Sequence, residues 1–183
     1  MSAEPQLFRI NPESQESERI EEVNFAQLGL QERRDIQEWI AANPSILGED
    51  LLIIGKEFSG FDRTDERLDL LAVDVDGKLV VIELKRDDTG ADAHWQAIKY
   101  ASYLHRASAE DIIRMFADHE GVSEEEALNK LLQHLGADDL SILNKDQRII
   151  LASHRFAPEV TSAALWLNEK APGEDLITCI QLT

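Results

Sequence analysis

The stretch that decides the fold is VVIELKRDD, residues 80–88. Its first three residues, Val80, Val81 and Ile82, are typical of a buried strand because they are β-branched and apolar. The strand runs directly into Glu83 and Lys85, and alternation of side chains across a strand places these two charges on one face. Charges near a core cost on the order of several kcal/mol unless something compensates them. The shared face therefore indicates either a functional site or an ion pair.

Length and composition predict one globular domain with a substantial core. The chain has 183 residues, of which 43% are hydrophobic and 30% charged. No apolar run approaches the roughly 20 residues that a membrane span needs, and the start MSAEPQLF lacks the basic and apolar regions of a signal peptide. With a single cysteine, Cys179, disulfides are not expected. These features predict a cytoplasmic protein without a membrane partner.

The net charge of -18 argues against a nucleic-acid binder that depends on a generally basic surface. The charge is unevenly distributed, however. Residues 107–140 hold nine acidic and two basic side chains, whereas residues 61–106 hold ten acidic and seven basic ones. The region around Glu83 and Lys85 is thus closer to electrical balance than the stretch that follows it.

Hydrophobic periodicity and helix-breaking residues divide the chain into an arm and a domain. Residues 1–27 read as a short strand, QLFRI, and an acidic arm, NPESQESERIEE, interpreted as a linker or loosely held segment. Residues 28–183 read as an α/β domain with a mixed central sheet flanked by helices. An acidic helical insertion is expected at 107–140, with Ser123 as an N-cap. The predicted helices are 31–42, 91–105, 110–118, 123–135 and 158–168, and the predicted strands of the domain are 51–58, 68–75, 78–85, 148–153 and 175–182.

Residues 68–85 read as an antiparallel hairpin whose turn includes Asp76-Gly77. A two-residue turn would place Leu70 opposite Glu83. A three-residue loop, Val75 to Gly77 with Gly77 in the left-handed conformation, would place Asp69 there instead. We prefer the second register because it gathers Asp69, Glu83 and Lys85 on one face.

Two carboxylates that meet at the end of a core strand repel each other, and a cation between them relieves the repulsion. Asp69 and Glu83 offer hard oxygen ligands, with no histidine or cysteine nearby in sequence. Such ligands favour Mg²⁺ or Mn²⁺ over zinc.

The pattern Asp69, thirteen residues, then Glu83-Leu84-Lys85 resembles the motif of the PD-(D/E)xK nuclease superfamily. More narrowly, residues 28–103 resemble the nuclease domain of NucS-type endonucleases, in which a helix glutamate, an aspartate, ELK and Gln-x-x-x-Tyr follow one another. The last element here is Gln96 to Tyr100, whose i, i+4 spacing places both side chains on one helical face. The first would be Glu32, which shares a predicted inward stripe with Ile36 and Trp39, while Glu38 is expected to face solvent.

The resemblance implies a restriction-endonuclease-like fold and a metal-dependent endonuclease or phosphodiesterase acting on DNA. Metal-activated water would attack the phosphodiester. Asp69, Glu83 and the main-chain carbonyl of Leu84 would hold Mg²⁺ or Mn²⁺, and Lys85 would orient the water or stabilise charge on the phosphorane. Glu32 would complete the metal shell through water, and Gln96 and Tyr100 would position the ligands or the phosphate.

The sequence departs from the NucS pattern in three respects. Leu68 precedes Asp69, at the position where the PD-(D/E)xK motif has proline. The basic surface is weak, and its candidates are Arg63, Arg67, Lys85, Arg86, Lys99 and Arg106. The roughly thirty residues before Glu32 leave no room for the N-terminal domain that NucS-type enzymes use for dimerisation and DNA binding. The form of the DNA therefore stays open between single-stranded, branched and mismatched DNA. Whether the protein forms a homodimer or has a protein partner also stays open.

Simpler readings exist for each candidate. Asp69, Glu83 and Lys85 could form an ordinary ion pair at a sheet edge, Gln96 and Tyr100 could be packing residues, and Glu32 could cap a helix or lie on the surface. The tryptophans Trp39, Trp95 and Trp166 are interpreted as core or rim anchors. The competing function is a non-catalytic nucleic-acid- or protein-binding module that keeps the nuclease fold, which the negative charge favours.

Overall fold

The computed structural model describes residues 6–21, 25, 27–58, 67–88, 93–171 and 175–182. Its centre is a mixed five-stranded sheet in the order β3-β4-β5-β6-β7. The three strands β3, β4 and β5 are antiparallel, whereas β6 and β7 run parallel to β5. These strands are β3 (Leu51–Phe58), β4 (Leu68–Asp74), β5 (Leu79–Asp88), β6 (Gln147–Arg155) and β7 (Ile177–Gln181). The α/β class and the mixed sheet expected from the sequence are confirmed.

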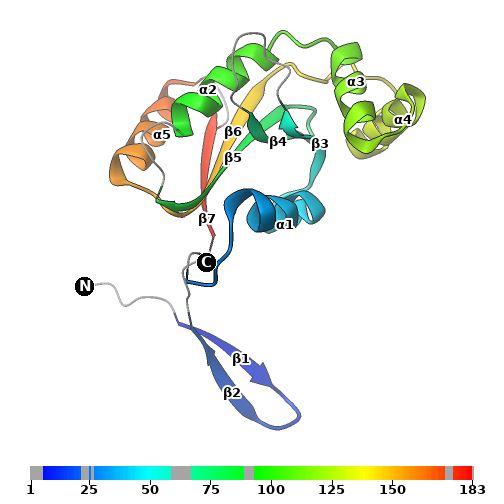
Figure 1. Ribbon diagram of the computed structural model, residues 1–183. Coiled ribbons are helices and arrows are strands. Elements are labelled where there is room, and N and C mark those ends of the chain that lie inside the picture. The colour runs from blue at the N-terminus through cyan, green and yellow to red at the C-terminus, as the bar shows by residue number, and fades with distance from the viewer. Residues whose placement is uncertain are drawn as a thin grey trace.

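Helices cover both faces of this sheet (Figure 1). One face carries α2, α5 and the pair α3–α4, and the other carries the short segments that precede β3. The helices are η1 (Glu32–Ile36), α1 (Gln37–Ala42), η2 (Pro44–Leu47), α2 (Ala93–Leu104), α3 (Ala109–Glu120), α4 (Glu124–Leu135) and α5 (Pro158–Lys170). Among the described residues, none of the helices is long and apolar enough to cross a membrane.

Alternation along the central strands builds two cores, one on each face of the sheet. Leu71 and Val81 pack in the cluster that contains α2 to α5, whereas Leu70 and Ile82 pack in the cluster that contains η1 and α1. Because both faces are covered, β4 is buried at every position. A continuous apolar strand is the expected sequence signature of such a doubly covered sheet.

The hairpin β4–β5 has the three-residue loop expected from the sequence. Val73 pairs with Leu79 and Leu70 with Ile82, so the same register continued by one pair brings Asp69 opposite Glu83. Asp74 N–H donates to Lys78 O at 3.1 Å, and Gly77 has a φ of 82°. Gly77 thus supplies the left-handed residue that this loop length requires.

The segment 31–42 is helical as predicted, but its first turn, η1, is a π-helix. The wider turn rotates the residues that follow away from α-helical periodicity. As a result Ile36 and Ile40 are buried, whereas Trp39 is 49% exposed. The inward stripe predicted through Trp39 is therefore wrong. Glu38 faces solvent as expected and pairs with Lys56, at 2.9 Å between Glu38 Oε1 and Lys56 Nζ.

The acidic helices α3 and α4 pack into the main core. Ser108 and Ser123 accept hydrogen bonds from the first turns of α3 and α4, which confirms Ser123 as an N-cap. Ile112, Phe116 and Leu131 are buried in the cluster on the α2 face. The pair is thus an excursion between α2 and β6 whose apolar sides close one end of the sheet, with its carboxylates in solvent.

The N-terminal region forms a separate two-stranded sheet of β1 (Leu7–Asn11) and β2 (Glu16–Ile20). In Figure 1 this hairpin projects away from the five-stranded sheet, and all ten of its residues are exposed. The strand expected near QLFRI is confirmed, but the polar run after it supplies a second strand and is not simply a linker. The division at residue 27 stays a prediction.

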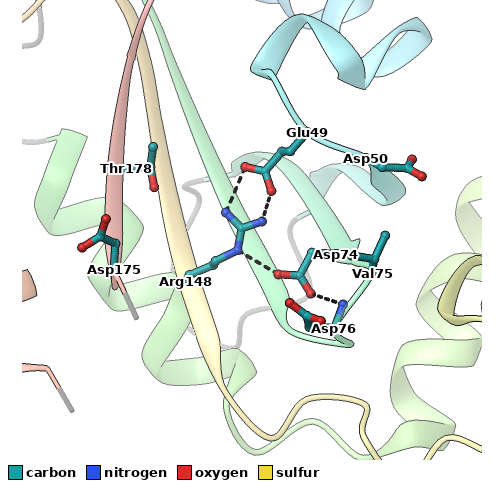
Figure 2. Close-up of a pocket in the computed structure, with 8 residues that line it drawn as sticks. All are labelled: Glu49, Asp50, Asp74, Val75, Asp76, Arg148, Asp175 and Thr178. Carbon is teal, nitrogen blue, oxygen red and sulfur yellow. Dashed lines mark hydrogen bonds and ion pairs between the residues drawn. The ribbon is translucent and has the colours of Figure 1, made fainter. Parts of the chain in front are cut away.

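A fully paired arginine fastens the end of the sheet that holds the β4–β5 turn (Figure 2). Arg148, at the start of β6, donates from Nε to Asp74 Oδ2 at 2.9 Å and from Nη1 to Glu49 Oε1 at 3.0 Å. Asp74 also accepts from the main-chain N–H of Asp76 and Lys78. The pocket around Arg148, about 270 Å³ in volume, is lined mainly by acidic residues. We interpret these contacts as a structural clamp, because Arg148 joins Glu49 to Asp74 through charged hydrogen bonds.

Replacing Gly77 with alanine should destabilise the protein by about 2 kcal/mol or more, as measured by urea unfolding. A Cβ at Gly77 would lie 3.0 Å from the main-chain oxygen of Ile142, in addition to the cost of the left-handed φ. Gly121→Ala is the matched control: its φ is 68° and nothing lies within 4 Å of the added carbon. We expect that variant to lose only about 1 kcal/mol. Equal losses in the two variants would contradict the tight packing assigned to the β4–β5 loop.

Candidate active site

The charged residues singled out in the sequence meet at the opposite end of β4 and β5 from the Arg148 clamp. A pocket of about 190 Å³ is lined by Glu32, Arg33, Arg67, Asp69, Glu83, Lys85 and Gln96. Asp69 lies at the start of β4, Glu83 and Lys85 lie in β5, and η1 and α2 contribute Glu32 and Gln96. No lining residue comes from 107–140, so the acidic helices do not wall this pocket.

Asp69 and Glu83 are both only 3% exposed. The main-chain N–H of Leu84 donates to Asp69 Oδ2 at 2.8 Å, and Lys85 Nζ donates to Glu83 Oε1 at 2.9 Å. The other oxygen of Glu83, Oε2, is buried and accepts no hydrogen bond from any described residue. A buried carboxylate oxygen without a donor is uncommon, and it is the kind of group that a cation would satisfy.

Burial and nearby carboxylates disturb the titration of both Asp69 and Glu83. Burial raises the pKa of Asp69 to about 6, although the Leu84 N–H and the Lys85 charge oppose the rise. Burial and then the charge of Asp69 raise the pKa of Glu83 to about 7. Strongly perturbed carboxyl groups at the wall of a pocket are typical of functional sites.

Lys85 lies between two carboxylates. Its Nζ is 2.9 Å from Glu83 Oε1 and 3.8 Å from Glu32 Oε1. Burial by itself would lower the pKa of Lys85, but the surrounding carboxylates, led by Glu83, raise it above its ordinary value. The side chain therefore carries a positive charge at neutral pH.

The two helical elements reach the site differently. Gln96 lines the pocket, whereas Tyr100, one turn further along α2, is buried in the core beneath it. Burial, followed by the charges of Glu83 and Asp69, raises the pKa of Tyr100 to about 12, so the phenol is electrostatically linked to the carboxylates. Glu32 lines the pocket from the π-helical turn. The structure thus brings all six side chains predicted from the sequence to one region.

Four contributing residues were missed or undervalued in the sequence. Gln37 is buried and donates from Nε2 to the main-chain oxygen of Asp69 at 2.9 Å, which ties η1–α1 to β4. Arg33 Nε lies 3.2 Å from Glu57 Oε1, and Arg67 Nη1 lies 3.6 Å from Glu57 Oε2. Both arginines line the pocket. No sequence spacing marks Gln37 or Glu57, since their roles depend on contacts between separate elements. Arg63 lies outside the described residues.

The donor set fits a hard divalent ion that keeps part of its shell as water. Within the described part of the chain, no three histidine, cysteine, aspartate or glutamate side chains come together as a metal cluster. Asp69 and Glu83 would therefore be the two carboxylate ligands. Mg²⁺ is commonly bound in this way, through one or two carboxylates, retained waters and substrate phosphate oxygens.

In the absence of divalent ions, we expect the protein to lose stability as pH rises from about 5 to about 8. The folded-state pKa values of Asp69 and Glu83, about 6 and about 7, exceed the ordinary values of 3.8 and 4.5. In this window the folded state binds more protons than the unfolded state, so deprotonation favours unfolding. Urea unfolding in EDTA across this pH range measures the slope.

Glu83→Gln should make this slope shallower by up to about 1.4 kcal/mol per pH unit, the value for one proton. Glu38→Gln, which removes an exposed carboxylate outside the pocket, should leave it unchanged. A Glu83→Gln variant with the wild-type slope would show that Glu83 is not the group that titrates.

Comparison with known proteins agrees with the family resemblance drawn from the sequence. The model of the endonuclease NucS C-terminal domain matches residues 32–137, which is more than half of the chain. No curated protein matches the sequence. Among solved structures, similarity is found to a repair endonuclease from Pyrococcus abyssi, with 18% identity, a TM-score of 0.43 and coverage of 83% of this chain and 47% of that one.

A second structure, described as an EndoMS–dsDNA2 complex, matches with 16% identity and a TM-score of 0.40, covering 80% of this chain and 43% of that chain. The protein therefore spans about half the length of the solved structures that it matches. The family match includes Glu32, Asp69, Glu83, Lys85, Gln96 and Tyr100. The resemblance drawn from these residues is confirmed, and the chain belongs to the family of the endonuclease NucS C-terminal domain.

Proposed function

We propose that the protein is a metal-dependent endonuclease or phosphodiesterase that acts on DNA. The observation that carries this proposal is the convergence of Asp69, Glu83 and Lys85 at one pocket, with a buried Glu83 oxygen that lacks a donor among the described residues. An ordinary ion pair consists of one carboxylate and one ammonium group, and the charges and hydrogen-bonding atoms of the two groups satisfy each other. Here two buried carboxylates repel each other, which favours a site built for an additional cation.

Asp69 and Glu83 would hold one or two Mg²⁺ or Mn²⁺ ions, with the main-chain carbonyl of Leu84 as a further ligand. Such an ion polarises the scissile phosphate and lowers the pKa of a water molecule enough for that water to attack the phosphodiester. The protein's part is to fix the carboxylates. The Leu84 N–H orients Asp69, and Gln37 holds the main chain of Asp69 from behind.

Lys85 is positioned to orient the attacking water or to stabilise negative charge on the phosphorane. The raised pKa of Lys85 keeps its ammonium group protonated, which suits charge stabilisation better than proton abstraction. Glu32, on the other side of Lys85 from Glu83, would complete the metal shell through water. Gln96 and Tyr100 would position the ligands or the phosphate from α2.

Arg33 and Arg67 would bind phosphate groups at the rim of the pocket. Both guanidinium groups share the carboxylate of Glu57, so these three side chains together carry one net positive charge. Arginine suits this role because its planar guanidinium group can donate two parallel hydrogen bonds to phosphate oxygens. Such a local excess could recruit DNA to a chain whose net charge is -18.

DNA as substrate is supported by the family match and by the description of one similar structure as a complex with dsDNA. The open candidates are single-stranded, branched and mismatched DNA. A homodimer or a protein partner that enlarges the DNA-binding surface is part of the proposal.

A non-catalytic binding module that retains the nuclease fold is the competing function. Two observations favour it: the net charge, and the absence of a third acidic metal ligand among the described residues. In that case Lys85 would simply neutralise Glu83 and Glu32, and the acidic surface would contact a protein partner.

We expect metal-dependent cleavage in an assay with end-labelled single-stranded, duplex, mismatched and flapped DNA in Mg²⁺ or Mn²⁺. Lys85→Ala should lower the rate by at least about 10²-fold, because it removes the positive charge beside the reacting phosphate. Gel electrophoresis of the labelled products gives the rate and ranks the substrates. Lys56→Ala is the matched control, since Lys56 makes a similar 2.9 Å ion pair with Glu38 outside the pocket.

Cleavage that persists at full rate in Lys85→Ala would reject the proposed site. Wild-type protein that is inactive on the whole panel, with or without metal, would favour the binding module.

Divalent ions should also raise the melting temperature without any substrate. Ligand at about 100 times its Kd contributes about 2.7 kcal/mol, and for a chain of this size about 1 kcal/mol shifts Tm by about 2–4 °C. Differential scanning fluorimetry with Mn²⁺ should therefore show a rise of several degrees. Asp69→Asn and Glu83→Ala should abolish the rise, whereas Glu38→Ala should retain it. A rise that survives both site variants would place the ion elsewhere.

A further inference from the structure

A strip of exposed aromatic and basic residues lies along α2, the helix that leaves the pocket. Trp95 is 66% exposed and Tyr103 is 47% exposed. Lys99 lies between them in sequence and is half-buried. Its Nζ is 5.3 Å from the centroid of the Tyr100 ring. We call Trp95, Lys99 and Tyr103 the α2 strip. Trp95 was interpreted from the sequence as a core or rim anchor, and its exposure excludes the core.

Helical spacing connects the α2 strip to the pocket. Gln96, Lys99 and Tyr103 follow one another at i, i+3 and i+7 and so share one flank of the helix. Gln96 lines the pocket, so the same flank continues from the pocket outward to Tyr103. Trp95 lies one turn before Lys99, at i, i+4. The strip from Gln96 to Tyr103 is roughly 10 Å long at 1.5 Å per residue.

Charge distinguishes α2 from the rest of this acidic protein. Residues 93–109 contain no aspartate or glutamate, although the chain carries 36 of them. The same segment carries Lys99 and Arg106. The helix therefore adds no carboxylate that would repel a polyanion approaching the pocket along it.

We propose that the α2 strip binds one strand of DNA and guides it to the pocket. The inference rests on the proposed nuclease function, and it identifies a surface for an unpaired strand beside the cleavage site. Bases would stack on Trp95 and Tyr103, and Lys99 would contact a phosphate between them.

The chemistry of the strip favours a single strand over a duplex. Base faces are covered by their neighbours in a duplex, so side-chain rings stack on bases only where a strand is unpaired or opened. Aromatic side chains alternating with a cation are the usual construction of single-strand binding surfaces. A protein partner would not require the absence of carboxylates over a whole helix.

Trp166 on α5 provides a matched comparison. Trp166 is 58% exposed, a fraction similar to that of Trp95. It does not line the pocket, and Glu169 lies one turn away from it on the same helix. Non-specific binding of DNA by exposed tryptophan would therefore involve Trp95 and Trp166 alike. Binding of a DNA strand that leads to the pocket would involve Trp95 but not Trp166.

The test measures binding without cleavage. Fluorescence anisotropy of a short labelled oligothymidylate is followed in EDTA at low ionic strength, with the intact chain and each variant. We expect Trp95→Ala and Tyr103→Ala each to raise Kd roughly 5- to 150-fold, the range for loss of one stacked base. Trp166→Ala should leave Kd unchanged, and Trp95→Tyr should restore most of the affinity. Lys99→Gln should reduce the salt dependence by about one phosphate contact.

The α2 strip would be rejected if the wild-type chain does not bind the oligonucleotide, or if Trp166→Ala weakens binding as much as Trp95→Ala. Equal losses for oligothymidylate and for blunt duplex would also reject it, because stacking requires an unpaired strand. Light scattering measures self-association of the chain. If Trp95→Ala abolished self-association instead of strand binding, the surface would be assigned to contact with a second copy of the chain. Failure of the nuclease proposal is seen separately, as strand binding that depends on Trp95 without cleavage in Mg²⁺ or Mn²⁺.

Discussion

The three-residue loop between β4 and β5 is the constraint on which the candidate site depends. With Gly77 at a φ of 82°, the loop sets a register in which Leu70 pairs with Ile82 and the next pair brings Asp69 to Glu83. A slip by one residue would send every side chain of β4 to the other face. Asp69 would then enter the core around Ile36 and Ile40, and the pocket would lose one of its two carboxylates.

The two ends of the same strands handle buried charge in opposite ways. At the turn end, Asp74 pairs with Arg148 and receives main-chain hydrogen bonds, so both of its carboxylate oxygens accept hydrogen bonds. At the pocket end, burial raises the pKa of Asp69, and burial together with the charge of Asp69 raises the pKa of Glu83. One Glu83 oxygen there lacks a donor among the described residues. The repulsion between Asp69 and Glu83 lowers stability at the pocket end of the strands. That is the end at which an additional cation would bind.

Sequence periodicity anticipated most of the sheet because each of its central strands contains a run of apolar residues. The prediction of a strand at 51–58 matches β3. Turn chemistry left two loop lengths open, and the three-residue loop was preferred because it gathers Asp69, Glu83 and Lys85 on one face. Periodicity failed at Trp39 because the π-helical turn at Glu32–Ile36 changes the rotation per residue. It also failed at Glu16–Ile20, where polar residues form a strand through main-chain pairing with β1. Neither effect leaves a mark in the pattern of apolar residues.

The sequence by itself determined which residues of β5 carry charge, that Gly77 could take a left-handed conformation, and that Gln96 and Tyr100 share a helical face. These properties are local, because they follow from strand alternation, glycine sterics and helical spacing. Only the tertiary structure decided that Gln37 holds Asp69, that Glu57 joins Arg33 to Arg67, and that Trp95 begins an exposed strip beside the pocket. These contacts connect elements far apart in the chain, and their geometry depends on how the helices pack against the sheet.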